Sequence, residues 1–235
     1  MLSGTMLFTS NGCKKDKPTP APITVTDVDG NTYKTITIGT QVWMAENLRT
    51  TQYADKTPIP EITDLASWTI DTKGAMCWYQ NDASNKVKYG ALYNWFAVTN
   101  PAGLAPQGWH VASDADWQTL EDYLIANGYN YDGSKTGNKI GKAVAATVGW
   151  TVDQTLGHVG NSSETNNKTG FNLPPAGFRY SNDFGFSGEG AYLWTTTSAS
   201  NKNAIYRGLN SYGYDLTSDG QALKNSGMSI RCVKD

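Results

Sequence analysis

The clearest pattern of hydrophobic positions in the chain predicts an amphipathic helix that begins after Ser113. Apolar side chains recur at helical spacing on one side of this segment: Trp117, Leu120, Tyr123 and Leu124. Ser113 suits the position before the helix, because its hydroxyl can accept the free backbone N–H groups of the first turn. Asn127 and Gly128 tolerate the left-handed backbone that ends many helices. The stripe therefore predicts a helix whose apolar face packs on the core.

Other segments alternate between apolar and polar residues or form short apolar runs, which predicts strands and turns. Residues 23–47 predict strand pieces joined by turns at Asp29-Gly30-Asn31 and at Gly39-Thr40. Residues 75–79 form a short apolar segment that favours a strand. Three closing strands are expected near the end of the chain: residues 193–197, 204–209 and 228–233.

Two further segments favour helix, and one favours a long loop. Residues 89–98 place aromatic residues on one helical face, and Asn100-Pro101 ends that helix because proline disfavours helical backbone in the residue before it. Residues 139–147 predict a short helix, whereas residues 161–170 are polar without periodicity and predict a surface loop. No internal repeat or linker follows residue 22. Residues 23–235 are therefore expected to form one α+β domain.

Composition agrees with short strands and long loops rather than a helical bundle. The 235 residues include 8 Trp, 13 Tyr and 24 Gly, while only 17% are charged. The net charge of -2 argues against a nucleic-acid partner, because such proteins usually carry a basic patch or stripe. No apolar run approaches the roughly 20 residues that span a bilayer.

The N-terminal segment resembles the end of a bacterial lipoprotein signal peptide. Small residues precede Cys13, which such a signal presents as the acylated first residue of the mature chain. Residues 14–22 are charged and proline-rich, and they predict an extended tether. The alternative is an ordinary disordered tail with an incidental cysteine. We expect residues 1–13 to be the signal remnant with its lipid-attachment cysteine, and the protein to be exported and lipid-anchored to the outer membrane or cell surface.

Residues 27–31, Asp-Val-Asp-Gly-Asn, faintly resemble a calcium-binding loop. An EF-hand that began at Asp27 would need Glu at its twelfth position, which is Ile38 in this chain. The segment therefore favours a hairpin turn over a metal site.

Six motifs, taken in order, carry a resemblance to a known family. They are Gly39–Leu48 (GTQVWMAENL), Tyr89–Trp95 (YGALYNW), Gly108–Asp114 (GWHVASD), Pro174–Arg179 (PPAGFR), Leu193–Thr196 (LWTT) and Ser229–Asp235 (SIRCVKD). With these motifs the chain resembles the Fibrobacter succinogenes major paralogous domain over about residues 24–235.

The resemblance implies a fold similar to C-type-lectin-like and formylglycine-generating-enzyme-like domains. Such a fold has a mixed, mostly antiparallel sheet with two main helices and long irregular loops. Family members resemble secreted or lipid-anchored surface proteins of unknown activity. The resemblance also places cysteines at Cys77 and Cys232, which we expect to form a disulfide between the last strand and the core. The alternative is two buried thiols.

Candidate catalytic chemistry is sparse, and we expect no enzyme and no cofactor. After Cys13 only the structural cysteine pair remains, so no spare thiols are left for the copper or oxygen chemistry of the enzyme-like relatives. His110 and His158 lie far apart in sequence, and His110 falls inside a core motif. Neither HExxH nor Gly-x-Ser-x-Gly occurs. A serine triad is defined by geometry, and the sequence leaves it open.

Recognition is the remaining class of function. Lectin-type calcium binding would need clustered ligands, and Asn182, Asp183 and Glu189 are the candidates; we predict no metal site and keep calcium as the alternative. Aromatic rings among glycines and amides suit sugar rings or a protein partner. The predicted ligand-binding residues are Tyr180, Asn182, Asp183, Phe184, Phe186, Tyr192, Tyr212 and Tyr214, with Phe178 beside them. The alternative is that about half of these rings fill the core under long loops.

We therefore predict a lipid-anchored surface protein that acts as a non-enzymatic binding or adhesion module for a glycan or a surface protein. The alternative is a structural subunit of a cell-surface assembly, such as a fimbrial tip or stalk component. The membrane is contacted through the lipid only.

Overall fold

The computed structural model describes residues 23–180 and 183–235, so the predictions for Cys13 and Asn182 lie outside the described residues. Within these two ranges, no helix combines the length and the apolar character that crossing a bilayer requires. The strands are β1 Thr24–Thr26, β2 Thr32–Ile38, β3 Gln41–Met44, β4 Met76–Cys77, β5 Leu92–Tyr93, β6 Trp109–Val111, β7 Ala176–Arg179, β8 Phe184–Ser187, β9 Gly190–Ser198, β10 Asn203–Asn210, β11 Thr217–Leu223 and β12 Cys232–Lys234. The helices are α1 Leu65–Ile70, α2 Asn85–Tyr89, α3 Trp95–Val98, α4 Asp114–Ala126 and α5 Gly141–Val144, with short 3₁₀ turns η1 Tyr79–Asn81 and η2 Ser163–Thr165.

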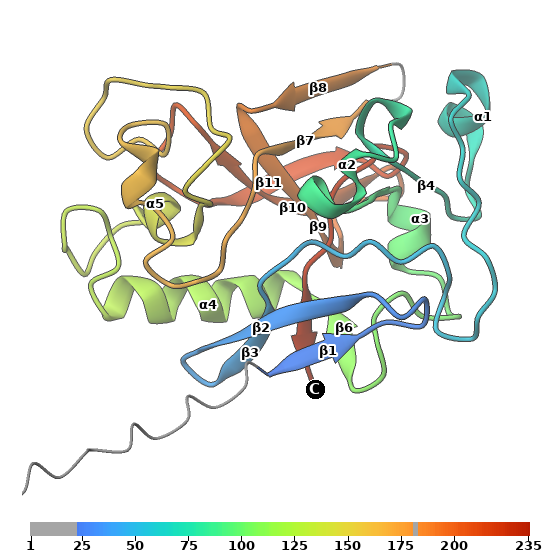
Figure 1. Cartoon of the computed structure of the whole chain (residues 1–235), viewed down its shortest axis with the longest axis horizontal. Helices are drawn as coiled ribbons and strands as arrows, with labels where there is room; N and C mark the ends of the chain where they lie inside the picture. Colours follow the sequence, from blue (N-terminus) through green and yellow to red (C-terminus); the bar gives the residue numbers. More distant parts are fainter. Residues whose placement is uncertain (1–22, 181–182) are drawn as a thin grey trace, which may run out of the picture.

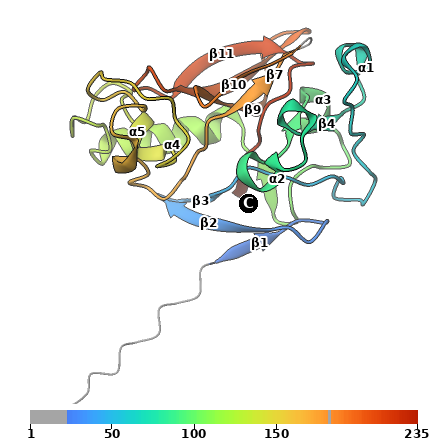
Figure 2. The ribbon, with the colours of Figure 1, turned by 45° about the horizontal axis from the view of Figure 1, so that its top comes forward.

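Two five-stranded sheets form the framework. The first has the order β1-β2-β3-β12-β6 and is antiparallel throughout, so the first and last described strands share one sheet. The second has the order β11-β10-β9-β7-β8 and is antiparallel except between β7 and β9. Figures 1 and 2 agree in placing α4 and α5 at one end of the molecule and α1, α2 and α3 at the other. The predicted mixed, mostly antiparallel α+β single domain is confirmed.

The core between α4 and the first sheet includes three aromatic rings in mutual contact. Trp43 of β3, Trp117 of α4 and Phe171 of a loop pack with ring centroids 4.8, 5.4 and 5.6 Å apart, all at tilted or edge-on angles. Offset and edge-on packing of this kind adds to the free energy gained from apolar burial. All three side chains are fully buried, and they lock the central helix onto β3.

Helix α4 confirms the pattern from which it was predicted, except at one position. Ser113 Oγ accepts the backbone N–H of Asp116, and the Asp116 carboxylate accepts the backbone N–H of Ser113, which completes a capping box. Trp117, Leu120 and Leu124 are fully buried. Tyr123 is 39% exposed instead, and its ring lies over the β2–β3 turn, where a Cβ on Gly39 would come within 2.8 Å of it.

The predicted helix over residues 89–98 is wrong. Helix α2 ends at Tyr89, Gly90 takes a left-handed φ of +76°, and β5 follows before α3 begins. A Cβ at Gly90 would lie 2.7 Å from the Cβ of Asn47, so this close approach requires glycine. Asn94 then caps α3 through Oδ1, which accepts the N–H groups of Ala97 and Ala75 at 3.0 Å. The apolar residues of the stripe are mostly buried as predicted, but the contact at Gly90 splits the segment into the end of α2, β5 and α3.

The other predicted helix, loop and last strand are present, but the helix and the strand are shorter than expected. The short helix expected in residues 139–147 is α5, and residues 161–170 form the predicted loop apart from the η2 turn. The expected strand over residues 228–233 is regular only from Cys232 onward. Among the described residues only α4, with 13 residues, is longer than six residues, so most helices are single short turns beside the sheets.

The predicted disulfide is not formed, and both cysteines are buried free thiols. Cys77 packs in a cluster with Trp68 and Leu92, whereas Cys232 packs in a different cluster. Each behaves as a small apolar side chain in its own part of the core. Burial raises the pKa of the Cys77 thiol to about 11 and raises that of Cys232 further, so neither thiol is ionised at neutral pH. The alternative of two buried thiols therefore describes the structure.

His110 links the last residue of the chain to helix α4. Its Nδ1 lies 2.7 Å from Asp235 Oδ1, and its Nε2 lies 3.2 Å from Asp116 Oδ2. Ser113 Oγ donates to Asp116 rather than to His110, so the serine–histidine contact of a catalytic triad is missing here. Partial burial lowers the pKa of His110, but the hydrogen bonds and charges of Asp235 and Asp116 outweigh it, and the pKa is raised above its ordinary value.

This contact predicts a pH-dependent contribution to stability. Because the folded pKa of His110 is above the unfolded value of about 6.5, the contribution is complete below about pH 6.5 and is lost as the pH rises through the folded pKa. We expect His110→Gln to lower Tm more near about pH 6 than near about pH 8.5. Thermal unfolding of both proteins across this range measures the difference. The same loss of Tm at both ends of the range would contradict the prediction.

Candidate ligand-binding surface

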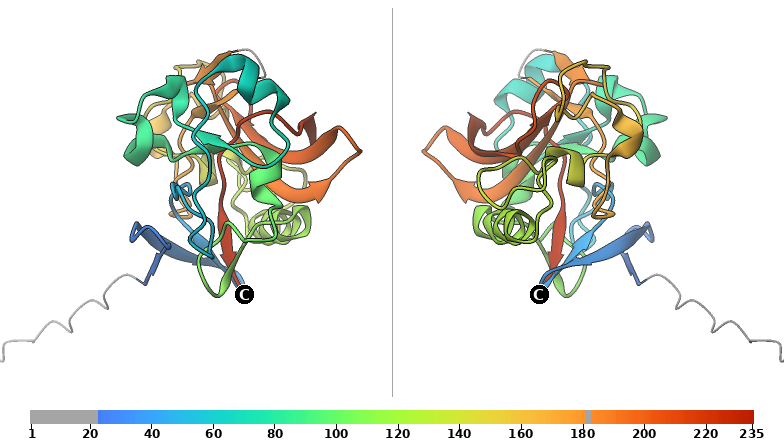
Figure 3. Two further views of the ribbon diagram at one scale, coloured as in Figure 1. Left: turned by 90° about the vertical axis from the view of Figure 1, so that its right-hand side faces the viewer. Right: turned by 90° about the vertical axis from the view of Figure 1, so that its left-hand side faces the viewer.

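The second sheet carries a row of aromatic side chains on one face, which we call the aromatic platform. Its members come from β7, the residues after β7, β8, β9 and β10: Phe178, Tyr180, Phe186, Tyr192 and Tyr206. The β9–β10–β11 side of this sheet projects from the body of the molecule (Figure 3). The platform therefore lies partly on a projecting part of the fold.

The rings of the platform contact one another in sequence across the strands. Centroids are 5.8 Å apart between Tyr206 and Tyr192, 4.8 Å between Tyr192 and Phe178, and 4.2 Å between Phe178 and Tyr180. Phe186 stacks parallel to Phe178, with centroids 5.8 Å apart and planes inclined by 2°. These separations are those of favourable aromatic pairs, so the rings hold one another in place.

Glycines in the strands leave room for the rings of the platform. In three neighbouring strand pairs a platform residue lies directly opposite a glycine: Tyr206 opposite Gly220, Tyr192 opposite Gly208 and Phe178 opposite Gly185. A Cβ at Gly220 would lie 2.6 Å from the Tyr206 ring, and a Cβ at Gly185 would lie 2.9 Å from the Tyr180 ring. Aromatic rings that cover strand glycines in this way compensate for the missing side chains.

The platform is open to solvent, most of all at Phe186. That side chain is 39% exposed, and its backbone has a φ of +62°. Left-handed backbone costs roughly 1–2 kcal/mol for a residue with a Cβ, and such strain is common at binding sites. Burial raises the pKa of Tyr192 to about 12, with Tyr206 and Tyr180 adding to the effect, so its hydroxyl stays protonated and can donate a hydrogen bond.

The structure brings together some of the predicted ligand-binding residues. Tyr180, Phe186 and Tyr192 meet on the platform with Phe178. Tyr206 was missed, because a single tyrosine within a predicted strand carries no signal of its face. Phe184 lies on the opposite face of β8, where its ring contacts Tyr79 at 5.4 Å and the Arg179 guanidinium at 5.2 Å.

The remaining predicted residues do not join the platform. Tyr214 packs against Tyr131 and His158 at centroid distances of 6.1 and 6.2 Å, in a separate part of the surface. Tyr212 is 48% exposed beside it in sequence. Asp183 is exposed, and its Oδ1 accepts the backbone N–H of Phe184 at 2.7 Å, so that oxygen serves a local turn. The predicted site therefore divides into the aromatic platform and a separate part of the surface that contains Tyr212 and Tyr214.

The hairpin interpretation of residues 27–31 agrees with the structure. Asp27 Oδ1 accepts the N–H groups of Asp29 and Asn31, and Oδ2 accepts the hydroxyl of Tyr33. Both carboxylate oxygens thus hold the β1–β2 turn. Across residues 23–180 and 183–235, no cluster of three or more His, Cys, Asp or Glu side chains is arranged to hold a metal ion.

Comparison with known proteins places the chain in a family. The model of the Fibrobacter succinogenes major domain matches residues 36–234, which span all strands from within β2 to β12. No curated protein and no solved structure matches the chain. Since the family model covers most of the sequence, the chain belongs to the Fibrobacter succinogenes major domain family.

Proposed function

We propose that this protein is a non-enzymatic binding module that holds a glycan against the aromatic platform. The observation that carries the proposal is the row of partly exposed rings that cover strand glycines and contact one another edge to face. Sugar rings have apolar C–H faces and polar edges, and flat aromatic faces with hydroxyl groups beside them match both features. Tyrosine and phenylalanine supply this contact area with few rotatable bonds to immobilise.

The geometry suits an extended saccharide better than a single sugar. Tyr206, Tyr192 and Phe178 follow one another across adjacent strands at 5.8 and 4.8 Å, so successive sugar units can contact successive rings. Because the strands fix the spacing, the surface is organised before the ligand arrives, which lowers the entropic cost of binding.

The proposal also covers the location of the protein and its relationship to C-type-lectin-like domains. Attachment to the outer membrane or cell surface through a lipid on Cys13 is supported by the small residues before this cysteine and by the charged, proline-rich segment after it. A relationship to C-type-lectin-like domains is supported by the mixed α+β architecture. Together these proposals describe a tethered surface module with its platform available to ligands outside the membrane.

A glycan array tests the function directly, with calcium and again with a chelator. We expect binding to at least one neutral oligosaccharide that survives the chelator, because stacking on aromatic rings needs no metal. Binding that the chelator abolishes would move the site to Asp183 and Glu189. No binding in either condition, with crosslinking to one surface protein on intact cells, would contradict the proposal and favour the assembly-subunit alternative.

The variant Phe186→Gly separates binding from folding. Glycine relieves the left-handed backbone of Phe186 while the exposed ring and its contact with Phe178 are lost, so we expect the free energy of unfolding to change by less than about 1 kcal/mol. Binding of the array ligand should weaken by about tenfold, the order of one stacking contact. Leu223→Ala, at a 50% exposed residue on β11, is the matched control. Unchanged affinity in Phe186→Gly would remove Phe186 from the site.

A further inference from the structure

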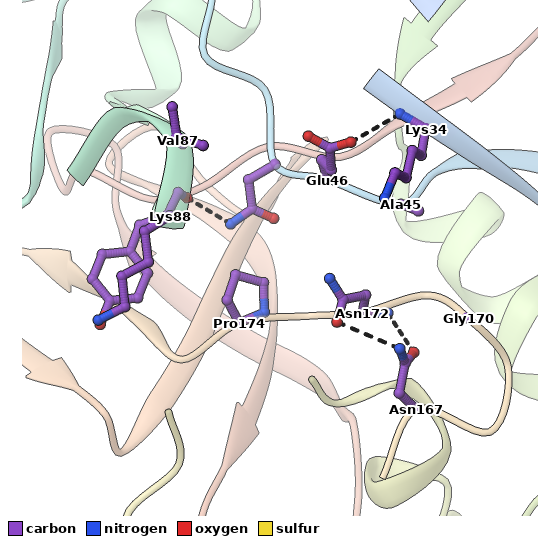
Figure 4. Close-up of a pocket in the computed structure, with 12 residues that line it drawn as sticks. Lys34, Ala45, Glu46, Val87, Lys88, Asn167, Gly170, Asn172 and Pro174 are labelled. Carbon is purple, nitrogen blue, oxygen red and sulfur yellow. Dashed lines mark hydrogen bonds between the residues drawn. The ribbon is translucent and has the colours of Figure 1, made fainter. Parts of the chain in front are cut away.

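A polar cleft lies apart from the aromatic platform, between β2, the segment after β3, the end of α2 and the loop before β7 (Figure 4). Its volume is about 570 Å³, which is within the range of pockets for small ligands. Three kinds of groups line it: two lysines and one glutamate, several amide side chains, and small apolar surfaces. The lining includes Lys34, Glu46, Asn47, Lys88, Asn172 and Pro174.

The charges of the cleft wall are unequal. Glu46 is already neutralised, because Oε2 forms an ion pair with Arg49 at 3.1 Å and Oε1 accepts the backbone N–H of Lys34 at 2.9 Å. Within the described residues, no carboxylate lies within ion-pair distance of the ammonium groups of Lys34 or Lys88. The Lys88 ammonium lies over the Tyr89 ring, 4.5 Å from its centroid. Lys34 is exposed and is the open cation of the wall.

A third positive charge lies beneath the floor. Arg231 is fully buried, and it donates to Asn47 Oδ1 at 2.7 Å and to the backbone oxygen of Asn172 at 3.0 Å, two residues that line the cleft. No acidic side chain of the described residues forms an ion pair with it. A buried guanidinium outside any ion pair creates a positive potential around it, which the Glu46 carboxylate offsets in part at longer range. The cleft thus concentrates positive charge in a chain whose net charge is -2.

The loop that closes the cleft presents a hydrogen-bond donor. Asn167 Nδ2 donates to Asn172 Oδ1 at 3.4 Å, and the Asn172 backbone N–H donates to Asn167 Oδ1 at 2.8 Å. The Asn172 amide nitrogen is therefore left to donate into the cleft (Figure 4). Both residues have left-handed backbone, with φ of 64° and 56°, a conformation that asparagine tolerates.

We propose that this cleft binds the carboxylate of an acidic saccharide unit, a hexuronate. The Lys34 ammonium and the Asn172 amide supply donors for the carboxylate, the free lone pairs of Glu46 accept sugar hydroxyls, and Pro174 offers an apolar surface to ring C–H groups. A carboxylate suits the cleft because its single negative charge matches the Lys34 ammonium, which has no carboxylate partner among the described residues. The inference rests on the proposed function in taking the ligand to be a saccharide, but the cleft and the platform share no residue.

The test compares digalacturonate with its methyl ester, which has the same rings without the charge. Calorimetric titration of the purified chain should show binding of the acid that is about fivefold stronger than that of the ester, the size of one partly exposed ion pair. The difference should shrink as salt rises from about 20 mM to about 200 mM. Lys34→Gln should remove the preference for the acid, whereas Lys135→Gln, at an exposed lysine outside the cleft, should keep it.

Several results would overturn the inference. Equal binding of the acid and the ester, equal effects of Lys34→Gln and Lys135→Gln, displacement of the acid by an equal concentration of inorganic sulfate, or no binding would each do so. If Phe186→Gly abolished binding of the acid and Lys34→Gln left it unchanged, the saccharide would bind at the platform. The proposed function would then stand while the cleft inference failed. If Lys34→Gln removed the preference for the acid and Phe186→Gly weakened binding of no glycan, the cleft inference would stand and the platform would be excluded as the glycan site.

Discussion

Replacing Arg231 by methionine is expected to lower the free energy of unfolding by about 4 kcal/mol, enough to unfold much of a marginally stable domain. The guanidinium donates to Asn47 Oδ1 and to the backbone oxygens of Met44, Phe171 and Asn172, all within 3.0 Å, and it lies 4.8 Å from the Phe171 ring centroid. Methionine fills the space but leaves these acceptors without donors. Each unsatisfied buried acceptor costs about 1–3 kcal/mol.

The control for this prediction is Arg231→Lys, which keeps the positive charge. A lysine ammonium cannot reproduce the planar fork of donors, so we expect most of the loss to remain. Urea unfolding of the three proteins measures the free energies. Full stability in Arg231→Lys would show that charge, and not the set of directed hydrogen bonds, is what the fold requires at this position.

Arg207→Met is expected to destabilise the protein by about 3–5 kcal/mol at neutral pH, because it removes one partner of a buried ion pair. Arg207 of β10 is fully buried and contacts two acids of α4, with Nε 2.8 Å from Asp114 Oδ1 and a terminal nitrogen 3.1 Å from Glu121 Oε2. Glu121 is only 7% exposed, so without Arg207 its charge would be buried with little compensation.

The sign of the pH dependence distinguishes this explanation from loss of packing. Burial raises the pKa of Glu121, and Arg207 opposes that rise, so removing Arg207 raises the pKa further. An acid with a raised folded pKa takes up a proton on folding, and stability then falls as the pH rises between the unfolded and folded values. The loss caused by Arg207→Met should therefore be smaller at about pH 5 than at about pH 8. The double variant with Glu121→Gln should show no such change with pH.

Local signals in the sequence were sufficient to predict elements that are defined by their own residues, without distant contacts. Helix α4 followed from its apolar stripe and its capping serine, and the β1–β2 hairpin followed from Asp29-Gly30-Asn31. In residues 89–98 the stripe was equally clear, but the approach of Asn47 to Gly90 divides it. Such a contact between residues far apart in the sequence leaves no local signal.

The platform was only partly predictable for a related reason. Strands β7, β8 and β11 contain glycines where a strand pattern would show side chains, so their alternation was hidden. Phe184 and Phe186 would share a face of a regular strand, but the left-handed φ of +62° at Phe186 departs from strand geometry, and its ring lies against Phe178 while that of Phe184 lies against Tyr79. The arginines of the family motifs, Arg179 and Arg231, are buried structural donors. A residue's place in a family motif therefore did not show whether its side chain is buried and structural or exposed and available to a ligand.

The most direct test of the central claim is saturation-transfer NMR with the neutral oligosaccharide that the array selects. Selective irradiation of aromatic protons should transfer magnetisation to C–H protons on one face of the sugar rings, because those protons would lie against the platform. The transfer should fall strongly in Phe186→Gly and persist in Leu223→Ala. Bound oligosaccharide that receives no magnetisation from the aromatic protons would contradict the account.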